Sequence, residues 1–359
     1  MKRSLFILGL VFTVFACSKD NDPGQEVQFD DTPYAFSFGD FPAPDLPPDN
    51  PLTVQGVQLG RMLFYEPKLS LDNSMSCASC HNQANGFSDT NRFSLGVHGL
   101  PGGRQAMAVF NMAWNNNGYF WDGRAPLLRN QALMPIEDSL EMAETLDNVV
   151  TKLAADRRYQ DQWVRAFGDE PISASTIALA LEQFMFSIVS VESKYDRFLR
   201  GEVNLTDSEE RGRELYFAEY NPFFPDESGA DCAHCHSPRN FENDQYMNNG
   251  LDAEADIDDF GLELVTGQVS DRGKMKVTSL RNIELTPPYM HDGRFQTLEE
   301  VVEHYNSGIQ SSSTLDITLA NTQQTGLMLD AQDKADLVAF LKTFTDEVLT
   351  TYEPYSSPF

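Results

Sequence analysis

The sequence predicts a mainly α-helical protein made of two similar domains with long loops, and three observations support this. The chain has 359 residues, enough for two domains with separate cores, because one domain commonly takes about 100 to 200 residues. A motif of the form C-x-x-C-H occurs twice, once in each half. Apolar residues recur mostly at helical spacing, and few segments show the alternation of apolar and polar residues that is typical of strands.

The two motifs occupy residues 77–81 and 232–236. In such a motif the thiols can form thioether bonds to the vinyl groups of a haem, and the histidine binds the iron. Zinc is the alternative, but zinc needs four ligands per site and does not explain a histidine after both cysteine pairs. We therefore predict two cytochrome c-like domains, each with one covalent haem c. The predicted haem ligands are Cys77, Cys80, His81, Cys232, Cys235 and His236.

Short helices are predicted before each motif, at residues 57–64 and 210–217. Both contain the pattern Gly-Arg-x-Leu-aromatic at a similar distance from the motif, which favours a duplicated domain. A single long helix is predicted over residues 172–199, where it would close the first core. A linker follows, and Thr206 with Glu209 forms a capping-box pattern that starts the next helix.

The last predicted helices cover residues 297–305 and 331–345. We assign residues 51–200 to an N-terminal haem domain and residues 201–359 to a C-terminal haem domain. Residues 18–50 precede them as a polar tether and an extended lead-in.

Residues 1–17 are typical of an export signal, with Lys2 and Arg3 before an apolar run that is too short to span a bilayer. The run ends at Cys17, so we predict a lipoprotein signal with Cys17 as the lipidated residue; an ordinary signal peptide is the alternative. The other four of the five cysteines belong to the haem motifs, which leaves none for a disulfide. The expected location is periplasmic or on the cell surface of a Gram-negative bacterium, with membrane contact through the lipid alone.

The formal net charge of -28 argues against nucleic acid as a partner, because phosphate backbones bind basic surfaces. The charge favours a basic electron-donor protein through electrostatic steering, although an acidic surface that only confers solubility is an equal alternative.

Further motifs carry a resemblance to a known family. Residues 119–124 read Tyr-Phe-Trp-Asp-Gly-Arg and are followed by Gln131, Pro135 and Glu141. The second half has Leu-Arg-Asn at residues 280–282 and Thr-Pro-Pro-Tyr-Met-His-Asp-Gly-Arg-Phe at residues 286–295. From about residue 58 to 305 the chain resembles the bacterial dihaem cytochrome c peroxidase and MauG family.

This resemblance implies that hydrogen peroxide reacts at the first haem, beside Gln131 and Glu141. Cleavage of bound peroxide needs a group that removes a proton from one oxygen and returns one to the other, and a carboxylate such as Glu141 can do both. Gln131 would position peroxide by hydrogen bonding. Trp121 would lie between the haems and relay electrons, although a purely structural aromatic is the alternative.

The resemblance also implies axial ligands. His98 falls where peroxidases of this family place a removable ligand of the first iron, and a surface-loop histidine is the alternative. Tyr305 is the expected sixth ligand of the second iron and Met290 competes with it; a phenolate lowers the potential of the iron, whereas a thioether raises it.

Family members bind a calcium ion between their domains, and the matching positions here are Gln105, Thr286 and Pro288. Calcium accepts amide and carbonyl oxygens, so the residue types fit. Arg124 and Arg281 are assigned either to haem propionates or to domain packing. A homodimer is compatible with the sequence.

Three functions follow from these features. The leading hypothesis is a dihaem peroxidase that reduces hydrogen peroxide to water, with electrons from a small cytochrome c or cupredoxin that enter at the C-terminal haem. The second is a MauG-like oxidase that modifies aromatic residues of a partner protein. The third is a non-catalytic dihaem electron carrier, in which both irons are capped by protein ligands.

Overall fold

The computed structural model describes residues 26–224 and 227–359, and it is mainly helical, as predicted. The predicted signal segment and Cys17 lie outside the described residues. The helices of the first half are α1 (Val54–Phe64), α2 (Cys77–Cys80), α3 (Leu128–Glu137), α4 (Leu146–Ala154), α5 (Arg157–Phe167) and α6 (Ala174–Ser187).

The second half begins with α7 (Lys194–Leu199) and α8 (Asp207–Phe217). Two short strands, β1 (Tyr246–Met247) and β2 (Met275–Lys276), pair antiparallel in its long loops. The remaining helices are α9 (Glu263–Thr266), α10 (Leu298–Glu303) with the π-helical turn His304–Gly308, α11 (Ile317–Ala320), α12 (Ala331–Lys342) and α13 (Glu347–Thr351).

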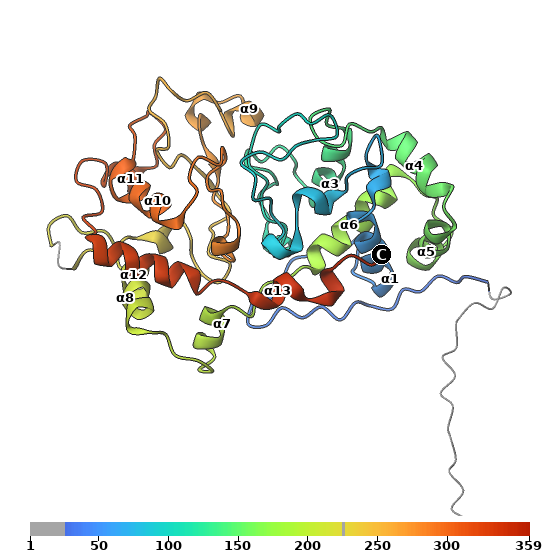
Figure 1. The fold of residues 1–359 in the computed structure, drawn as a ribbon, viewed down its shortest axis with the longest axis horizontal. Coiled ribbons are helices and arrows are strands. Elements are labelled where there is room, and N and C mark those ends of the chain that lie inside the picture. The colour runs from blue at the N-terminus through green and yellow to red at the C-terminus, as the bar shows by residue number, and fades with distance from the viewer. Residues whose placement is uncertain (1–25, 225–226) are drawn as a thin grey trace, which may run out of the picture.

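Each half has its own hydrophobic core, and the two halves lie side by side in Figure 1. The first core gathers apolar residues of α1, α3, α5 and α6, and the second gathers those of α8, α10 and α12. The chain end crosses between them: Leu349 and Tyr355, from α13 and the turn after it, are buried in the first core. The predicted domain boundary at residue 200 stays a prediction.

The two cores are built around the same helix crossing. A Cβ atom at Gly60 of α1 would lie 1.9 Å from the carbonyl oxygen of Ala180 on α6. A Cβ atom at Gly212 of α8 would lie 2.0 Å from the carbonyl oxygen of Asp336 on α12. Only glycine lets these backbones approach so closely, so the repeated Gly-Arg pattern marks the same packing contact in both halves.

The single helix predicted over residues 172–199 is wrong, because α6 ends at Ser187 and α7 starts only at Lys194. Distant side chains bind the extended backbone between them. Asn111 accepts a hydrogen bond from the Ser190 N–H at 2.8 Å. Asp346 accepts hydrogen bonds from the N–H groups of Val191 and Glu192, both at 3.0 Å. These tertiary bonds replace the helical ones that apolar periodicity alone would predict.

No helix within residues 26–224 and 227–359 has both the length and the apolar character that crossing a membrane requires.

Candidate active site

The first motif forms α2, whose start is capped by reciprocal hydrogen bonds between Ser76 and Ser79. Cys77, Cys80 and His81 line a cavity of about 430 Å³, a size typical of cofactor sites. The described cysteines are all free thiols, available for thioether bonds. Nδ1 of His81 lies 3.2 Å from the carbonyl oxygen of Phe87, a contact in which Nδ1–H donates and Nε2 stays free to bind a metal.

Burial sets the protonation of these groups. Burial lowers the pKa of His81, which favours the neutral imidazole that binds iron. Burial also raises the pKa of the Cys77 thiol to about 12, and the charge of Cys80 adds to the effect. The first motif therefore presents two neutral thiols and a neutral, oriented imidazole to one cavity, the donor set that a covalent haem requires.

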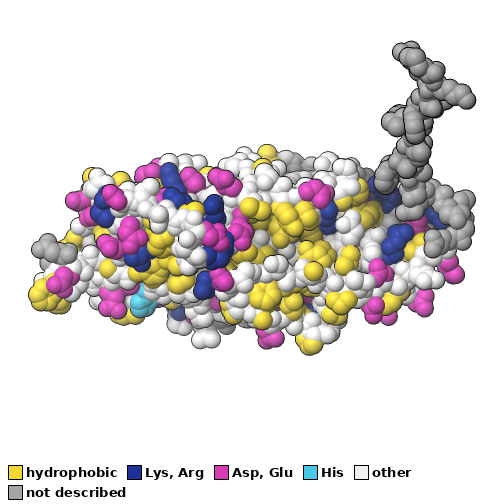
Figure 2. All heavy atoms as spheres, turned by 90° about the horizontal axis from the view of Figure 1, so that it is seen from below, with side chains coloured by type: hydrophobic (Ala, Val, Ile, Leu, Met, Phe, Trp, Pro, Cys, Tyr) yellow, Lys and Arg dark blue, Asp and Glu magenta, His cyan; other side chains and the backbone are white. Residues whose placement is uncertain are grey.

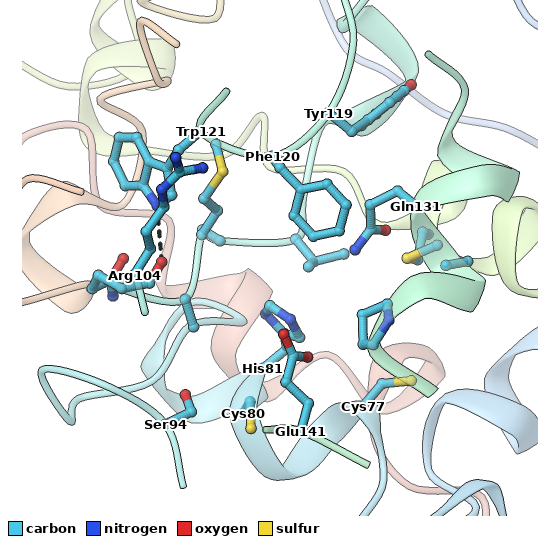
Figure 3. A pocket seen from close by; sticks show the side chains of 18 of the residues that line it. Cys77, Cys80, His81, Ser94, Arg104, Tyr119, Phe120, Trp121, Gln131 and Glu141 are labelled. Carbon is cyan, nitrogen blue, oxygen red and sulfur yellow. Dashed lines mark hydrogen bonds between the residues drawn. The ribbon is translucent and has the colours of Figure 1, made fainter. Parts of the chain in front are cut away.

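Gln131 and Glu141 line the same cavity, and Figure 3 shows both side chains pointing into it. Gln131 is on α3, and Glu141 lies on the turn after this helix. Burial raises the pKa of Glu141, and the nearby charge of Asp138 raises it further, while Arg124 opposes this. A carboxyl group with a raised pKa can both accept and return a proton near neutral pH.

The backbone of Glu141 is held by the loop that contains His98. The Val97 N–H donates to the Glu141 carbonyl oxygen at 2.8 Å. A Cβ atom at Gly96 would lie 2.0 Å from the carbonyl oxygen of Leu140. This loop therefore fixes where Glu141 enters the cavity. His98 itself is exposed and is not among the residues that line the cavity, so its role as a removable ligand stays a prediction.

Trp121 also lines the first cavity and joins it to the second half of the chain. Its indole N–H donates to the Gln105 carbonyl oxygen at 2.9 Å, and its own carbonyl oxygen accepts from the Lys276 N–H of β2 at 2.8 Å. The His291 ring lies edge-on to the indole, with ring centroids 6.4 Å apart. The indole thus lies at the junction between the two halves, and its place between the haems stays a prediction.

Arg104 is a residue that the sequence analysis missed. Its guanidinium donates two hydrogen bonds to Asp259, at 2.7 and 2.8 Å, and one to Asp122 at 2.7 Å. Asp259 belongs to the second half, whereas Arg104 and Asp122 flank the Gln105 and Trp121 contact. Arg104 therefore links the segment that contains Trp121 to the second half of the chain. No local sequence pattern predicts this contact.

The second motif repeats the histidine geometry. Nδ1 of His236 lies 3.1 Å from the carbonyl oxygens of Phe241 and Thr278, and burial lowers the pKa of His236 to about 4. Sγ of Cys235 lies 3.5 Å from Sδ of Met247, a neighbour that the sequence analysis did not find.

The two competing ligands of the second site lie together. The side-chain amide nitrogen of Asn249 lies 3.3 Å from both Sδ of Met290 and the hydroxyl of Tyr305. Burial raises the pKa of Tyr305 to about 12, and the Cys235 and Cys232 thiols, which lie near enough to interact, add to it. Tyr305 therefore lies near the second motif, Met290 shares the Asn249 contact with it, and the choice between the two ligands stays a prediction.

A repeated loop explains how the two sites differ. Residues 119–125 and 289–295 are each closed by a bridge between their first and last residues. Phe120 and Met290 hold equivalent positions in these loops, and both adopt left-handed backbone conformations, with φ of 68° and 72°. Phe120 lines the first cavity, and its phenyl ring cannot bind iron. The second site has a sulfur atom at the matching position.

The residues predicted for calcium lie near the junction of the halves. Gln105 is buried and its backbone N–H donates to the carbonyl oxygen of His291 at 2.7 Å, while its side-chain amide donates to Ser88 and Asp89. Thr286 lies beside Gly86, 3.2 Å from a Cβ atom built there. Within the described ranges, no cluster of three or more His, Cys, Asp or Glu side chains could hold a metal ion, and calcium at Gln105, Thr286 and Pro288 stays a prediction.

His304, the first residue of the π-helical turn, is buried and its Nε2 lies 3.1 Å from the Asn249 carbonyl oxygen. Arg281 forms a buried ion pair with Asp196 and therefore serves packing.

Comparison with known proteins identifies the family to which the chain belongs. The family model described as "Di-haem cytochrome c peroxidase" matches residues 54–204. The methylamine utilization protein MauG of Methylorubrum extorquens is 36% identical over 305 residues, which cover 84% of this chain and 81% of that protein. The chain belongs to the di-haem cytochrome c peroxidase and MauG family.

Other members of the family are similar over comparable lengths. The cytochrome c551 peroxidase of Nitrosomonas europaea is 33% identical over 83% of this chain and 82% of its own length. A crystal structure of a MauG-like protein associated with microbial copper homeostasis is 36% identical, with a TM-score of 0.76, and covers 89% of this chain and 97% of that one. The family implies haem c cofactors, and both motifs, with their oriented histidines and free thiols, fit that group.

Proposed function

We propose that this chain is an exported dihaem peroxidase that reduces hydrogen peroxide to water with electrons from a small redox protein. The observation that carries the proposal is that Gln131 and Glu141 line the same cavity as Cys77, Cys80 and His81. Relatives named cytochrome c peroxidase support the class of reaction.

Cys77, Cys80 and His81 would hold the first haem, and Cys232, Cys235 and His236 the second. A bound haem supplies an iron that takes electrons and binds peroxide. Around it, the Gln131 amide orients peroxide by hydrogen bonding, and Glu141 accepts a proton from one peroxide oxygen and returns it to the departing oxygen. The half-buried position of Glu141 limits the access of bulk water to these protons.

Trp121 supports an electron path between the two halves. Its ring lies edge-on to His291, and its backbone bonds to β2, so it links the first cavity to the second half of the chain. Electrons would enter at the second haem, whose sixth ligand we propose to be Tyr305 in preference to Met290. We retain His98 as a removable ligand of the first iron, which requires its loop to move.

The donor that we propose is a basic cytochrome c or cupredoxin, since the net charge of -28 would attract it. On the face in Figure 2, acidic and basic side chains are interspersed among hydrophobic ones. We further propose a periplasmic or surface location in a Gram-negative bacterium, a lipid anchor at Cys17, and a calcium ion at Gln105, Thr286 and Pro288.

The test is peroxide consumption by the haem-loaded protein with a reduced cytochrome as donor. Glu141→Gln should slow consumption by about 10²- to 10⁴-fold, the usual contribution of general acid–base catalysis. Glu137→Gln is the matched control, because Glu137 is exposed at the end of α3 and does not line the cavity. Consumption by Glu141→Gln at the parent rate would refute the assignment.

The pH dependence offers a second check. Because the pKa of Glu141 lies above its ordinary value of 4.5, activity should fall as pH drops through a point above 4.5. That acidic limb should be absent from the residual activity of Glu141→Gln.

A second candidate function is a MauG-like oxidation of aromatic residues on a partner protein. It is favoured by the position of Tyr305 beside the second motif and by relatives named MauG. It predicts poor turnover with cytochrome donors and peroxide-dependent oxidation of a tryptophan or tyrosine on the partner.

A further inference from the structure

The second half of the chain closes one end of the first cavity with polar side chains. These residues are Asn240, Glu242, Lys276, Thr278 and Ser279. Elsewhere the cavity wall is mostly apolar around the first motif, with phenylalanine, methionine and leucine side chains. The polar end brings a carboxyl group, Glu242, that the proposed peroxide chemistry does not use.

Glu242 is held in place by a chain of amides that crosses between the halves. The Asn240 amide donates to the Glu242 carboxylate at 2.6 Å, and its oxygen accepts from the Asn111 amide at 2.9 Å. Asn111 in turn donates to the carbonyl oxygen of Ser190 at 3.1 Å. Glu242 thus has a fixed position relative to the first core, although it follows the second motif in sequence.

No lysine or arginine within the described ranges forms an ion pair with Glu242. The nearest cation, Lys276, donates instead to Asp244 at 2.5 Å and to the carbonyl oxygen of Asn117 at 3.2 Å. Tyr119 of the first half lies near enough that, after burial and the charges of Glu182 and Asp244, the Glu242 charge also helps to raise the Tyr119 pKa. The carboxyl group therefore lacks a partner that would keep it ionised at all pH values.

The surroundings of Glu242 bring its ionised and neutral forms into balance near pH 7. Burial raises the pKa of Glu242 to about 7, and the negative charge of Asp244 adds to this, while the Asn240 hydrogen bond and Lys276 oppose it. The other carboxyl groups that line the cavity are Asp122, Asp138 and Glu141. Of these, Asp122 is paired with Arg104 and Arg124.

We propose that Glu242 is a redox-linked proton site of the first haem. When one electron from the donor protein reaches the first iron, the Glu242 carboxylate binds one proton from solvent, and it releases that proton when the electron leaves. The added negative charge is balanced inside the cavity by one positive charge. This inference rests on the proposed function insofar as the first cavity must hold a haem that takes electrons.

Linkage makes the proposal measurable, because a proton that binds on reduction makes the reduction potential depend on pH. One proton per electron changes the reduction equilibrium up to tenfold per pH unit, which is about 59 mV for a one-electron couple. The potential of the first haem should therefore fall as pH rises through neutrality. The part of this slope due to Glu242 should vanish in Glu242→Gln.

The experiment is a spectroscopic redox titration of the haem-loaded protein between about pH 5.5 and 8.5, near the ordinary range of a carboxyl with a raised pKa. Glu284→Gln is the control, because Glu284 is exposed and does not line the cavity, and it should keep the parent slope. A Glu242→Gln slope equal to that of the parent would overturn the proposal, whether or not the protein consumes peroxide.

A second measurement needs no variant. The infrared difference spectrum between reduced and oxidised parent protein, at a pH near 7.5, should show a protonated carboxyl band that appears on reduction. Absence of any such band would overturn the proposal. A protein that shows the band and the slope but does not consume peroxide would keep the proton site and would refute only the proposed function.

Discussion

The buried ion pair between Asp196 and Arg281 should be a major source of stability in the second half. Arg281 is 2% exposed and Asp196 is 6% exposed. The guanidinium donates to both carboxylate oxygens at 2.8 Å and also to the Arg239 carbonyl oxygen. The guanidinium lies 4.7 Å from the ring centroid of Phe41, so Asp196→Asn would leave a buried charge among aromatic rings.

Removing one partner of a buried ion pair lowers the free energy of unfolding by about 3–5 kcal/mol, because the remaining charge stays buried and uncompensated. The pKa of Asp196 supports this: burial raises it, but the hydrogen bonds and charge of Arg281 prevail and hold it below 3.8. A carboxylate whose pKa is lowered by folding stabilises the fold at any pH above 3.8, its pKa in the unfolded chain. This stabilisation is lost as the pH falls through the pKa of the folded state. The difference between parent and Asp196→Asn should therefore shrink in acid.

The assay is equilibrium urea unfolding at pH 7, followed by circular dichroism. The control is Glu210→Gln, which removes a more exposed partner of Arg213 three residues away and should cost less than about 1 kcal/mol. Asp196→Leu combined with Arg281→Met should recover most of the loss, because no charge is left unpaired. The reasoning would be refuted if Asp196→Asn lowered the free energy of unfolding by less than about 1 kcal/mol. It would also be refuted if the double variant were no more stable than Asp196→Asn.

Two close backbone contacts give further predictions. Gly96→Ala should reduce peroxide consumption, because the new Cβ atom would lie 2.0 Å from the Leu140 carbonyl oxygen and displace Glu141. Gly103→Ala should keep the parent rate of peroxide consumption, since a Cβ atom there meets nothing within 4 Å. Equal rates would contradict this. Gly212→Ala should destabilise the second core by about 1–3 kcal/mol through overpacking against Asp336, as a thermal melt would show; an unchanged melting temperature would contradict it.

The sequence predicted much of the fold because the relevant signals are local. The cysteine and histidine spacing lies within one helical turn, and the Gly-Arg pattern marks the same helix crossing in both halves. Gln131 and Glu141 enter one cavity because they lie on one helix and the turn that follows it.

The remaining features depend on contacts between residues far apart in the sequence. The break between α6 and α7 is stabilised by Asn111 and Asp346, which lie well outside the segment. Arg104 and Glu242 become parts of the first site only when the second half packs against it. Periodicity reports burial within one element and carries no information about such partners.

The most direct measurement is electron paramagnetic resonance of the haem-loaded protein, fully oxidised and half-reduced. If Glu141 acts on peroxide at the first haem and the second haem only transfers electrons, the half-reduced protein should contain one haem that is high-spin or binds an added ligand. Two irons that keep protein ligands on both faces at every oxidation level would contradict the proposed peroxidase and leave an electron carrier.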